Sequence, residues 1–353
     1  MIPNQWYPIC LGRELRSRPL ALRRMGRDLV AWRTADGCAV VMDDRCPHRG
    51  AALSLGKVRG EELECPWHGF RYDASGACRR IPCEGTGAKV PAGLVVPTYT
   101  VAEGHELVWL LWHPKAPHRE APATLPPLPW FDDFEDGNPT DAWAAIDWPV
   151  NHVRSIEANF DVHHFPFVHG SLFPGSGKRL DPYEVEIEDT CIRTRGQLRR
   201  EGRSKGLSFR IDFVAPTLTR LEFSGFVFVV ADSPVDAYNT RRHVVYRQSW
   251  LRLPGMGRFL SWLFLVVDWK LLQNRQDLRV AASQTPRLPD AAAEHLVRAD
   301  AGTAAYRKLR HRLLRESGAV PEGDAVASVQ RDSVSGPRPT RDDRARAKGP
   351  PRD

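Results

Sequence analysis

Long hydrophobic runs are scarce in this chain of 353 residues. The most apolar stretch, Phe259–Val267, is only nine residues long and is flanked by charged side chains. A membrane-spanning helix needs about twenty apolar residues, so we expect no membrane span. The stretch is expected to form a buried helix or a wall of an apolar substrate cavity, with peripheral membrane contact as the less favoured alternative.

Signals for export and for nucleotide binding are also missing. The N-terminus begins Met1-Ile2-Pro3-Asn4 and soon becomes rich in arginine, without the apolar core of an export signal. We therefore expect a cytoplasmic protein with reduced thiols. No dinucleotide fingerprint follows a predicted strand, and Gly175–Lys178 has only part of a phosphate-binding loop. The chain is therefore not expected to bind NAD(P)H itself.

The positive charge does not indicate a nucleic-acid partner. The net charge is +7, but after Gln330 seven Lys and Arg residues stand against four Asp residues, so much of the excess lies in the tail. No nucleic-acid-binding module with interleaved aromatic residues is visible. A basic surface could instead steer an acidic partner protein.

Two cysteine–histidine pairs carry the main chemical signal. Cys46-Pro47-His48 and Cys65-Pro66-Trp67-His68 are separated by sixteen residues. Two thiolates and two imidazoles suit a [2Fe–2S] cluster in which Cys46 and Cys65 bind one iron and His48 and His68 bind the other. A tetrahedral zinc site is the alternative, but zinc fingers usually keep their two cysteines together and their two histidines together. The other cysteines are expected to be small packed residues rather than disulfide partners: Cys10, Cys38, Cys78, Cys83 and Cys191.

Turn sequences place both pairs at the tips of β-hairpins. Leu29–Arg33 and Cys38–Met42 are short alternating runs joined by the turn sequence Thr34–Gly37, and the first pair follows directly. Phe70–Tyr72 is predicted to be the strand that leaves the second pair, with Asp73–Gly76 as its turn. The first unit is therefore expected to be all-β.

The first cysteine–histidine pair continues into Arg49-Gly50 and the second into Gly69-Phe70. With these residues, the two pairs resemble the Rieske domain of ring-hydroxylating and related oxygenases. Asn4–Tyr7 and Ile81-Pro82 are similar to the oxygenase subunits of the vanillate demethylase and pheophorbide a oxygenase branch. Respiratory-chain Rieske proteins have an extra cysteine in each loop, whereas Ala51 and Gly69 stand near those places here. The resemblance thus implies a cluster of the lower-potential oxygenase type.

Length and composition predict more than one domain in an α+β protein. We expect a Rieske domain at 1–113, a proline-rich linker at 114–140, a catalytic domain at 141–320 and a disordered basic tail at 321–353. The catalytic domain should hold an antiparallel sheet flanked by helices, of the helix-grip type. It is expected to begin with a helical segment and to continue through alternating runs at Glu184–Ile187, Leu207–Phe213, Leu221–Val230 and His243–Trp250.

The segment Glu157–His169 is dense in possible metal ligands. Asp161 and His164 would share a helix face, while His164 and His169 would diverge on a regular helix. We expect Pro166 to break the helix after His164 and to bring His169 back toward the same metal. Two histidines and one carboxylate form the facial triad of non-haem Fe(II) oxygenases. The family spacing selects His164 and His169, which leaves His163 for packing or for a role beside the site.

The third iron ligand follows from the resemblance alone. Asp277–Gln284 is similar to the late helix that carries this ligand in the family, so Asp277 is the expected residue. Asp268 is the alternative, and an ordinary solvated charge is the other interpretation of either residue.

Asp161 matches the family's Asp three residues before the first iron histidine. The resemblance implies that it links by hydrogen bonds to a Rieske histidine of a neighbouring subunit, in a head-to-tail ring that is expected to be a homotrimer. Glu157, one turn earlier, could support this bridge or form an exposed salt bridge.

Together these features imply the terminal component of an oxygenase system. Electrons would come from a ferredoxin or a flavin reductase, with NAD(P)H used only indirectly, and O₂ would oxidise a hydrophobic small molecule. A Rieske electron carrier without oxygenase activity and a zinc-stabilised binding module are the alternatives. Aromatic residues that could line a substrate cavity or form plain core are Phe160, Phe165, Phe167, Phe223, Phe226, Phe228, Trp262 and Phe264.

Overall fold

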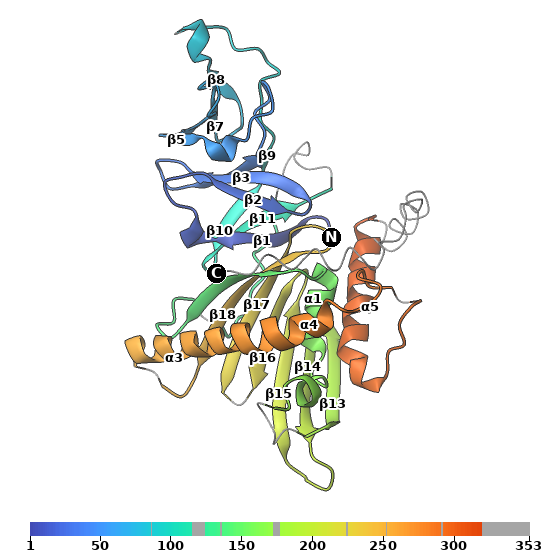
Figure 1. Ribbon diagram of the computed structural model, residues 1–353. Helices are drawn as coiled ribbons and strands as arrows, with labels where there is room; N and C mark the ends of the chain where they lie inside the picture. Colours follow the sequence, from blue (N-terminus) through green and yellow to red (C-terminus); the bar gives the residue numbers. More distant parts are fainter. Residues whose placement is uncertain are drawn as a thin grey trace, which may run out of the picture.

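Short β-strands form the N-terminal part of the molecule (Figure 1). The computed structural model describes residues 1–319 except 86, 115–123, 135, 172–176, 224, 252 and 291. The expected tail at 321–353 and part of the expected linker lie outside these residues.

Three sheets of the N-terminal part have the strand orders β1-β11-β10, β2-β3-β4-β9 and β5-β6-β7-β8. Their strands are β1 (Gln5–Leu11), β2 (Leu20–Arg24), β3 (Arg27–Arg33), β4 (Ala39–Asp43), β5 (Lys57–Arg59), β6 (Glu62–Glu64), β7 (Arg71–Asp73), β8 (Cys78–Arg80), β9 (Thr98–Tyr99), β10 (Val101–Gly104) and β11 (Leu107–Trp112).

Both hairpins predicted from the turn sequences are present. β3 and β4 pair across the Thr34–Gly37 turn, in which the Gly37 amide donates to the Thr34 carbonyl. β7 and β8 pair across a turn in which the Gly76 amide donates to the Asp73 carbonyl.

The C-terminal part is built on one antiparallel sheet of seven strands in the order β12-β18-β17-β16-β15-β14-β13. Its strands are β12 (Ala142–Trp148), β13 (Arg179–Glu188), β14 (Cys191–Arg199), β15 (Gly206–Val214), β16 (Leu218–Phe223), β17 (Phe226–Pro234) and β18 (Thr240–Gln248). The α+β class with an antiparallel sheet and helices, expected from the sequence, is confirmed.

Two secondary-structure predictions for the C-terminal part were wrong. This part begins with strand β12 and not with a helix, because Ala142 and Ile146 pack on one face of the sheet while Ala145 packs on the other. Burial on both faces hides the polar–apolar alternation of a strand.

The run Leu221–Val230, predicted as one alternating run, forms two strands. The chain reverses between Phe223 and Phe226, where Gly225 has a φ of 87° that glycine adopts without strain.

The two faces of the seven-stranded sheet have different neighbours. Helices α1 (His152–Phe160), α3 (Pro254–Val267) and α5 (Ala301–Glu316) cover one face, where the main core forms. The opposite face packs against β1 and β11 of the N-terminal part. In β18, for example, Val244 and Tyr246 face the helices while Val245 faces the N-terminal strands.

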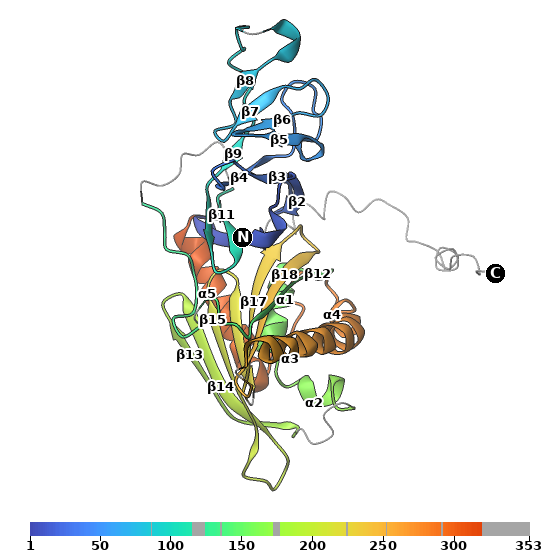
Figure 2. The same cartoon turned by 90° about the vertical axis from the view of Figure 1, so that its left-hand side faces the viewer.

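One long rod of helix crosses the sheet (Figures 1 and 2). It consists of α3, a π-helix at Asp268–Asp277 and α4 (Leu278–Ala281). The short helix α2 (Phe165–Val168) lies near its far end. Among the described residues, no helix combines the length and the apolar character that crossing a bilayer requires.

Candidate metal centres

The two cysteine–histidine loops have the same backbone hydrogen bond. In one loop the amide of Gly50 donates to the carbonyl of Cys46 at 2.8 Å, and in the other Gly69 donates to Cys65 at 3.1 Å. Both glycines have positive φ angles, 78° and 72°, which a residue with a Cβ adopts only with strain. The chain therefore forms two loops with the same closing hydrogen bond, with the histidine two residues after the cysteine in one loop and three residues after it in the other.

The four expected cluster ligands lie together between these loops. Cys46 and Cys65 are each 2% exposed, whereas His48 is exposed and His68 is half-buried. The two imidazole rings are 4.8 Å apart between centroids. The hydroxyl of Tyr72 lies 3.1 Å from Sγ of Cys46. Two buried thiols with two imidazoles nearer the solvent fit a [2Fe–2S] cluster whose outer iron is bound by histidine.

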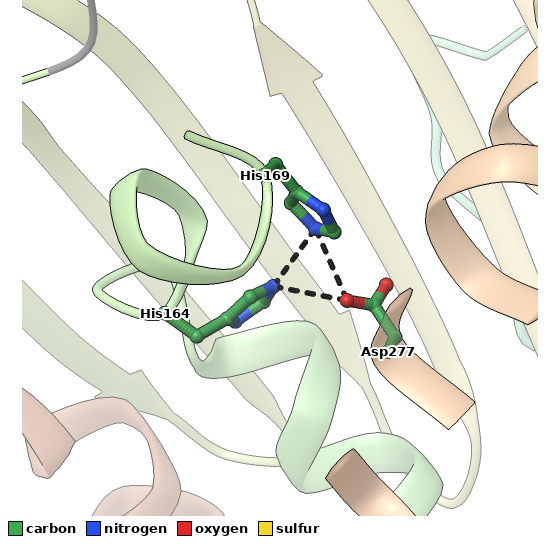
Figure 3. A group of neighbouring side chains, drawn as sticks. All are labelled: His164, His169 and Asp277. Atoms are coloured by element: carbon green, nitrogen blue, oxygen red, sulfur yellow. Dashed lines mark hydrogen bonds and ion pairs between the residues drawn. The ribbon is translucent and has the colours of Figure 1, made fainter. Parts of the chain in front are cut away.

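A second group of donor atoms lies in the C-terminal part (Figure 3). Nε2 of His164 and Nε2 of His169 are 3.3 Å apart, and Oδ1 of Asp277 is 3.1 Å from the second and 3.7 Å from the first. Metal–ligand bonds of about 2.1 Å at right angles put neighbouring donor atoms about 3 Å apart. Oδ1 of Asp277 is buried and has no hydrogen-bond partner among the described residues. This donor set therefore fits a metal ion bound on one side by two imidazoles and a carboxylate.

Helix α2 brings the two histidines together, by a route that differs from the expected one. Helix α1 already ends at Phe160, so Asp161 and His164 do not share a helix face. Pro166 stands in the first turn of α2, where a missing amide proton costs nothing, and it does not break a helix after His164. His164 and His169 flank this single turn at its two ends. The expectation that Pro166 acts as a breaker was wrong.

Gln276 supports His169, and sequence analysis missed it. Nδ1 of the buried His169 lies 2.7 Å from Oε1 of Gln276, the residue before Asp277. An amide oxygen only accepts, so this bond places the ring proton on Nδ1 and leaves Nε2 free for a metal. A glutamine beside an aspartate in a polar helix carries no signal of this role.

Asp161 lies beside His164 and His163. Its Oδ1 accepts the backbone amide of His164 at 3.1 Å and is 3.1 Å from Nδ1 of His163. Burial acts to raise the pKa of Asp161, but the hydrogen bond and charge of His164 outweigh it, and the pKa lies below its ordinary value. Nε2 of His163 lies 3.5 Å from Asp300, so His163 points away from the donor group of Figure 3.

Asp268, the alternative third ligand, faces other partners. Its carboxylate accepts hydrogen bonds from Tyr246 and from Gln273. Burial raises the pKa of Asp268. Of the two candidate aspartates, the structure brings Asp277 to the histidine pair and leaves Asp268 in a polar network beside it.

Arg242 connects the two sides of this network. From β18, its guanidinium donates to Oδ1 of Asn159 at 2.5 Å and to Oε1 of Gln273 at 3.1 Å. Its Nε is 3.4 Å from the carboxylate of Asp232, which is fully buried. Asn159 belongs to α1 and Gln273 to the π-helix. Arg242 therefore joins the helix before His164 to the helix that ends at Asp277.

Glu157 does not form the exposed salt bridge considered for it. The side chain is buried and lies 2.6 Å from Arg307 of α5 and 3.5 Å from Arg154. Its carboxylate is thus directed toward α5.

A row of aromatic rings begins at the histidine pair. The ring of Phe165 is 5.2 Å from that of His169 and stacks on Phe223 at 6.3 Å. Phe223 stacks on Phe228 at 6.3 Å, and Phe228 stacks on Tyr246 at 5.0 Å. The other expected cavity residues lie elsewhere: Phe160 packs in the core with Phe213, Phe226 and Phe264 contact each other, and Phe167 and Trp262 are exposed.

Comparisons with known proteins agree with this arrangement. Residues 5–100 match the Rieske [2Fe-2S] domain family. The chain is 31% identical to protein TIC 55 of Arabidopsis thaliana over 57% of its length and 36% of that protein's length. It is 35% identical to the aminopyrrolnitrin oxygenase PrnD of Pseudomonas fluorescens over 46% of this chain and 45% of the relative. The matched region thus spans less than half the length of these curated relatives.

A third relative matches over most of both chains. The methylxanthine N1-demethylase NdmA of Pseudomonas putida is 27% identical over 69% of this chain and 72% of its own length. The solved structure of NdmA with caffeine superposes with a TM-score of 0.68 at 24% identity, covering 90% of this chain and 92% of that chain. This likeness shows the fold of both parts. The chain therefore contains a Rieske [2Fe-2S] domain, and its two parts together have the fold seen in NdmA.

Proposed function

We propose that this chain is the terminal oxygenase of a multicomponent system that oxidises a hydrophobic, aromatic or polycyclic small molecule with O₂. The observation that carries the proposal is the convergence of His164, His169 and Asp277, whose three donor atoms lie within 3.7 Å of one another. A pure electron carrier has no use for this group. An Fe(II) ion held there on one side would supply oxygen activation.

The surrounding residues have distinct tasks in this proposal. Gln276 holds His169 in the tautomer whose Nε2 is free, and Asp161 orients the segment that carries His164. The aromatic row Phe165, Phe223 and Phe228 offers an apolar surface beside the site. Such a surface favours a hydrophobic substrate and excludes water from the reaction.

We also propose that electrons cross between subunits. Figures 1 and 2 place the sheet β5–β8, next to the cysteine–histidine loops, at the opposite end of the molecule from α2. The side chain of Asp161 is 38% exposed, which leaves room for an imidazole of His48 or His68 from a neighbouring copy. A closed head-to-tail ring, proposed to be a homotrimer, would form this contact at every interface. A separate ferredoxin or flavin reductase would deliver electrons from NAD(P)H in the cytoplasm.

Asp161→Asn tests the electron path. In this proposal the change slows product formation in a single turnover at least about tenfold, while the cluster spectrum and iron content stay unchanged. Asp300→Asn, beside the same histidine segment, is the matched control and should have a smaller effect. Equal single-turnover rates for Asp161→Asn and the unmodified chain would contradict this role.

The reaction class is identified by turnover with a surrogate ferredoxin and reductase, driven by NADH, over a panel of hydrophobic metabolites. Mass spectrometry then separates hydroxylation, dioxygenation, demethylation, and the loss of two hydrogens by desaturation or cyclisation. PrnD is named an aminopyrrolnitrin oxygenase and NdmA a methylxanthine N1-demethylase, so aminopyrrolnitrin and methylxanthines come first in the panel. Cluster oxidation without any product across the panel would favour the alternative, a Rieske electron-transfer protein without oxygenase activity.

A further inference from the structure

Helix α3 is apolar on two opposite sides. One side packs against β12 and β18, where Ser261 and Leu265 are buried. The opposite side carries a stripe with helical spacing whose members are exposed: Met256 (59%), Phe259 (58%), Leu263 (40%) and Val267 (39%). Trp262 flanks this stripe and Leu271 continues it, at 50% and 36% exposure. A helix that is apolar all round is usually buried, yet this one lies on the surface (Figures 1 and 2).

The exposed charges along the same rod are all positive. Arg258, Lys270, Arg275 and Arg279 are exposed, and none of them forms an ion pair with another residue that the structure describes. The two carboxylates of the rod are directed inward. Asp268 accepts hydrogen bonds from Tyr246 and Gln273, and Asp277 faces the histidine pair. Lys270 stands three residues after Val267 and continues the exposed stripe, whereas Arg258 has the helical position of Ser261 and Leu265 at the other side of α3. The outer face of the rod is therefore apolar and aromatic, with exposed cations on it and beside it.

We propose that this outer face binds the surface of a lipid bilayer that contains anionic lipids. Helices with aromatic and aliphatic side chains beside Lys and Arg lie in the interface of such bilayers. Apolar side chains enter the headgroup boundary, and each cation near an anionic surface strengthens binding about fivefold. The rod protrudes from the sheet in Figure 2, and its exposed side chains are accessible without rearrangement of the sheet.

A second copy of the chain is a poorer partner for this face. A symmetric contact between two such faces would bring the exposed cations of one copy close to the same cations of the other. Like charges brought together at an interface oppose association. An anionic lipid surface neutralises the same charges. Binding of this face to a bilayer does not depend on the proposed reaction.

Vesicle flotation of the full chain with its cluster tests this proposal. The protein should float with vesicles of phosphatidylcholine mixed with phosphatidylglycerol, should bind phosphatidylcholine alone more weakly, and should be released by salt. Phe259→Gln should weaken binding to the mixed vesicles about tenfold or more, because it removes a large apolar side chain. Lys270→Gln, which removes the exposed cation that continues the stripe, should weaken it about fivefold.

Two matched controls lie away from the rod. Val297→Gln replaces a side chain that is 64% exposed, and Lys308→Gln removes an exposed cation from α5. Neither control should change vesicle binding. The visible spectrum of the cluster and circular dichroism verify folding of each variant. Absence of binding to the mixed vesicles, or equal weakening by the controls, overturns the proposal. Light scattering that shows Phe259→Gln dissociating an oligomer, with no vesicle binding, would instead assign the face to contacts between copies.

Discussion

The two candidate metal centres of this chain are built in different ways. The four proposed cluster ligands all lie within residues 46–68, on two loops that close with their own backbone hydrogen bonds. The second centre needs side chains far apart in sequence, since Gln276 meets His169 across 107 residues. The first centre therefore depends on local turns, whereas the second depends on how α1, the rod and the sheet pack together. Changes in the packing of the C-terminal part should disturb only the second centre.

Asp277→Ala should have the largest effect and should separate the two centres. Removal of one of three protein ligands leaves two imidazoles, which bind Fe(II) too weakly to retain it through purification. We expect mononuclear iron to fall to near zero and product formation to disappear, while the cluster spectrum is unchanged. Metal analysis and visible spectroscopy measure both. Asp290→Asn, an exposed aspartate, is the control, and loss of the cluster together with the mononuclear iron would contradict the separation.

Arg242→Met tests whether packing holds the second centre. The change leaves the fully buried Asp232 without its cation, and breaking a buried pair costs about 3–5 kcal/mol of unfolding free energy. Urea denaturation followed by circular dichroism measures this cost. Arg241→Met is the matched control. Its partners Asp147 and Glu14 are more exposed, so it should cost at most about 1 kcal/mol. Equal stability of the two variants would show that Arg242 does not join the helices.

Gln276→Ala tests whether a residue that does not itself bind the metal orients His169 in the second centre. Loss of the acceptor for Nδ1 frees the imidazole of His169 to rotate and to change tautomer. Residues that orient a metal ligand in this way typically contribute about 10–100-fold in metal affinity. Titration of metal-free protein with Fe(II) under anaerobic conditions checks the value. The exposed Gln284→Ala should leave the affinity unchanged, and an unchanged affinity in Gln276→Ala would assign Gln276 a purely structural role.

Tyr72→Phe should have the smallest effect and should change only the first centre. The hydroxyl of Tyr72 lies 3.1 Å from Sγ of Cys46, and a hydrogen bond to a cluster sulfur stabilises the reduced state. A neutral hydrogen bond contributes about 0.5–1.5 kcal/mol, which for a one-electron couple corresponds to about 20–65 mV. The reduction potential should fall by that amount in voltammetry. A potential that stays the same or rises would contradict the assignment.

The first centre could be predicted from the sequence because its signals lie close together along the chain. The ligand spacing, the turn Thr34–Gly37 and the strand after Phe70 all lie within a few residues of each other. Their hydrogen bonds are made within the same hairpins. Each signal supports the others without knowledge of the tertiary fold.

Tertiary packing explains what the sequence did not show in the second centre. The helix termini at Phe160 and Pro166 were misjudged, although the spacing of His164 and His169 was informative. Asp277 followed only from a family resemblance, since nothing local distinguishes it from Asp268. Arg242 lies on a strand and gave no sign of its contacts with α1 and the π-helix. Contacts of this kind exist only after the sheet has formed.

We propose that this one chain holds two separate iron centres. Iron and acid-labile sulfide measured on anaerobically purified protein distinguish two iron centres from a single cluster. We expect about three iron and about two sulfide per chain, with two of the iron ions in the cluster and one at His164, His169 and Asp277. About two iron with two sulfide after anaerobic reconstitution, or zinc without sulfide, would contradict it.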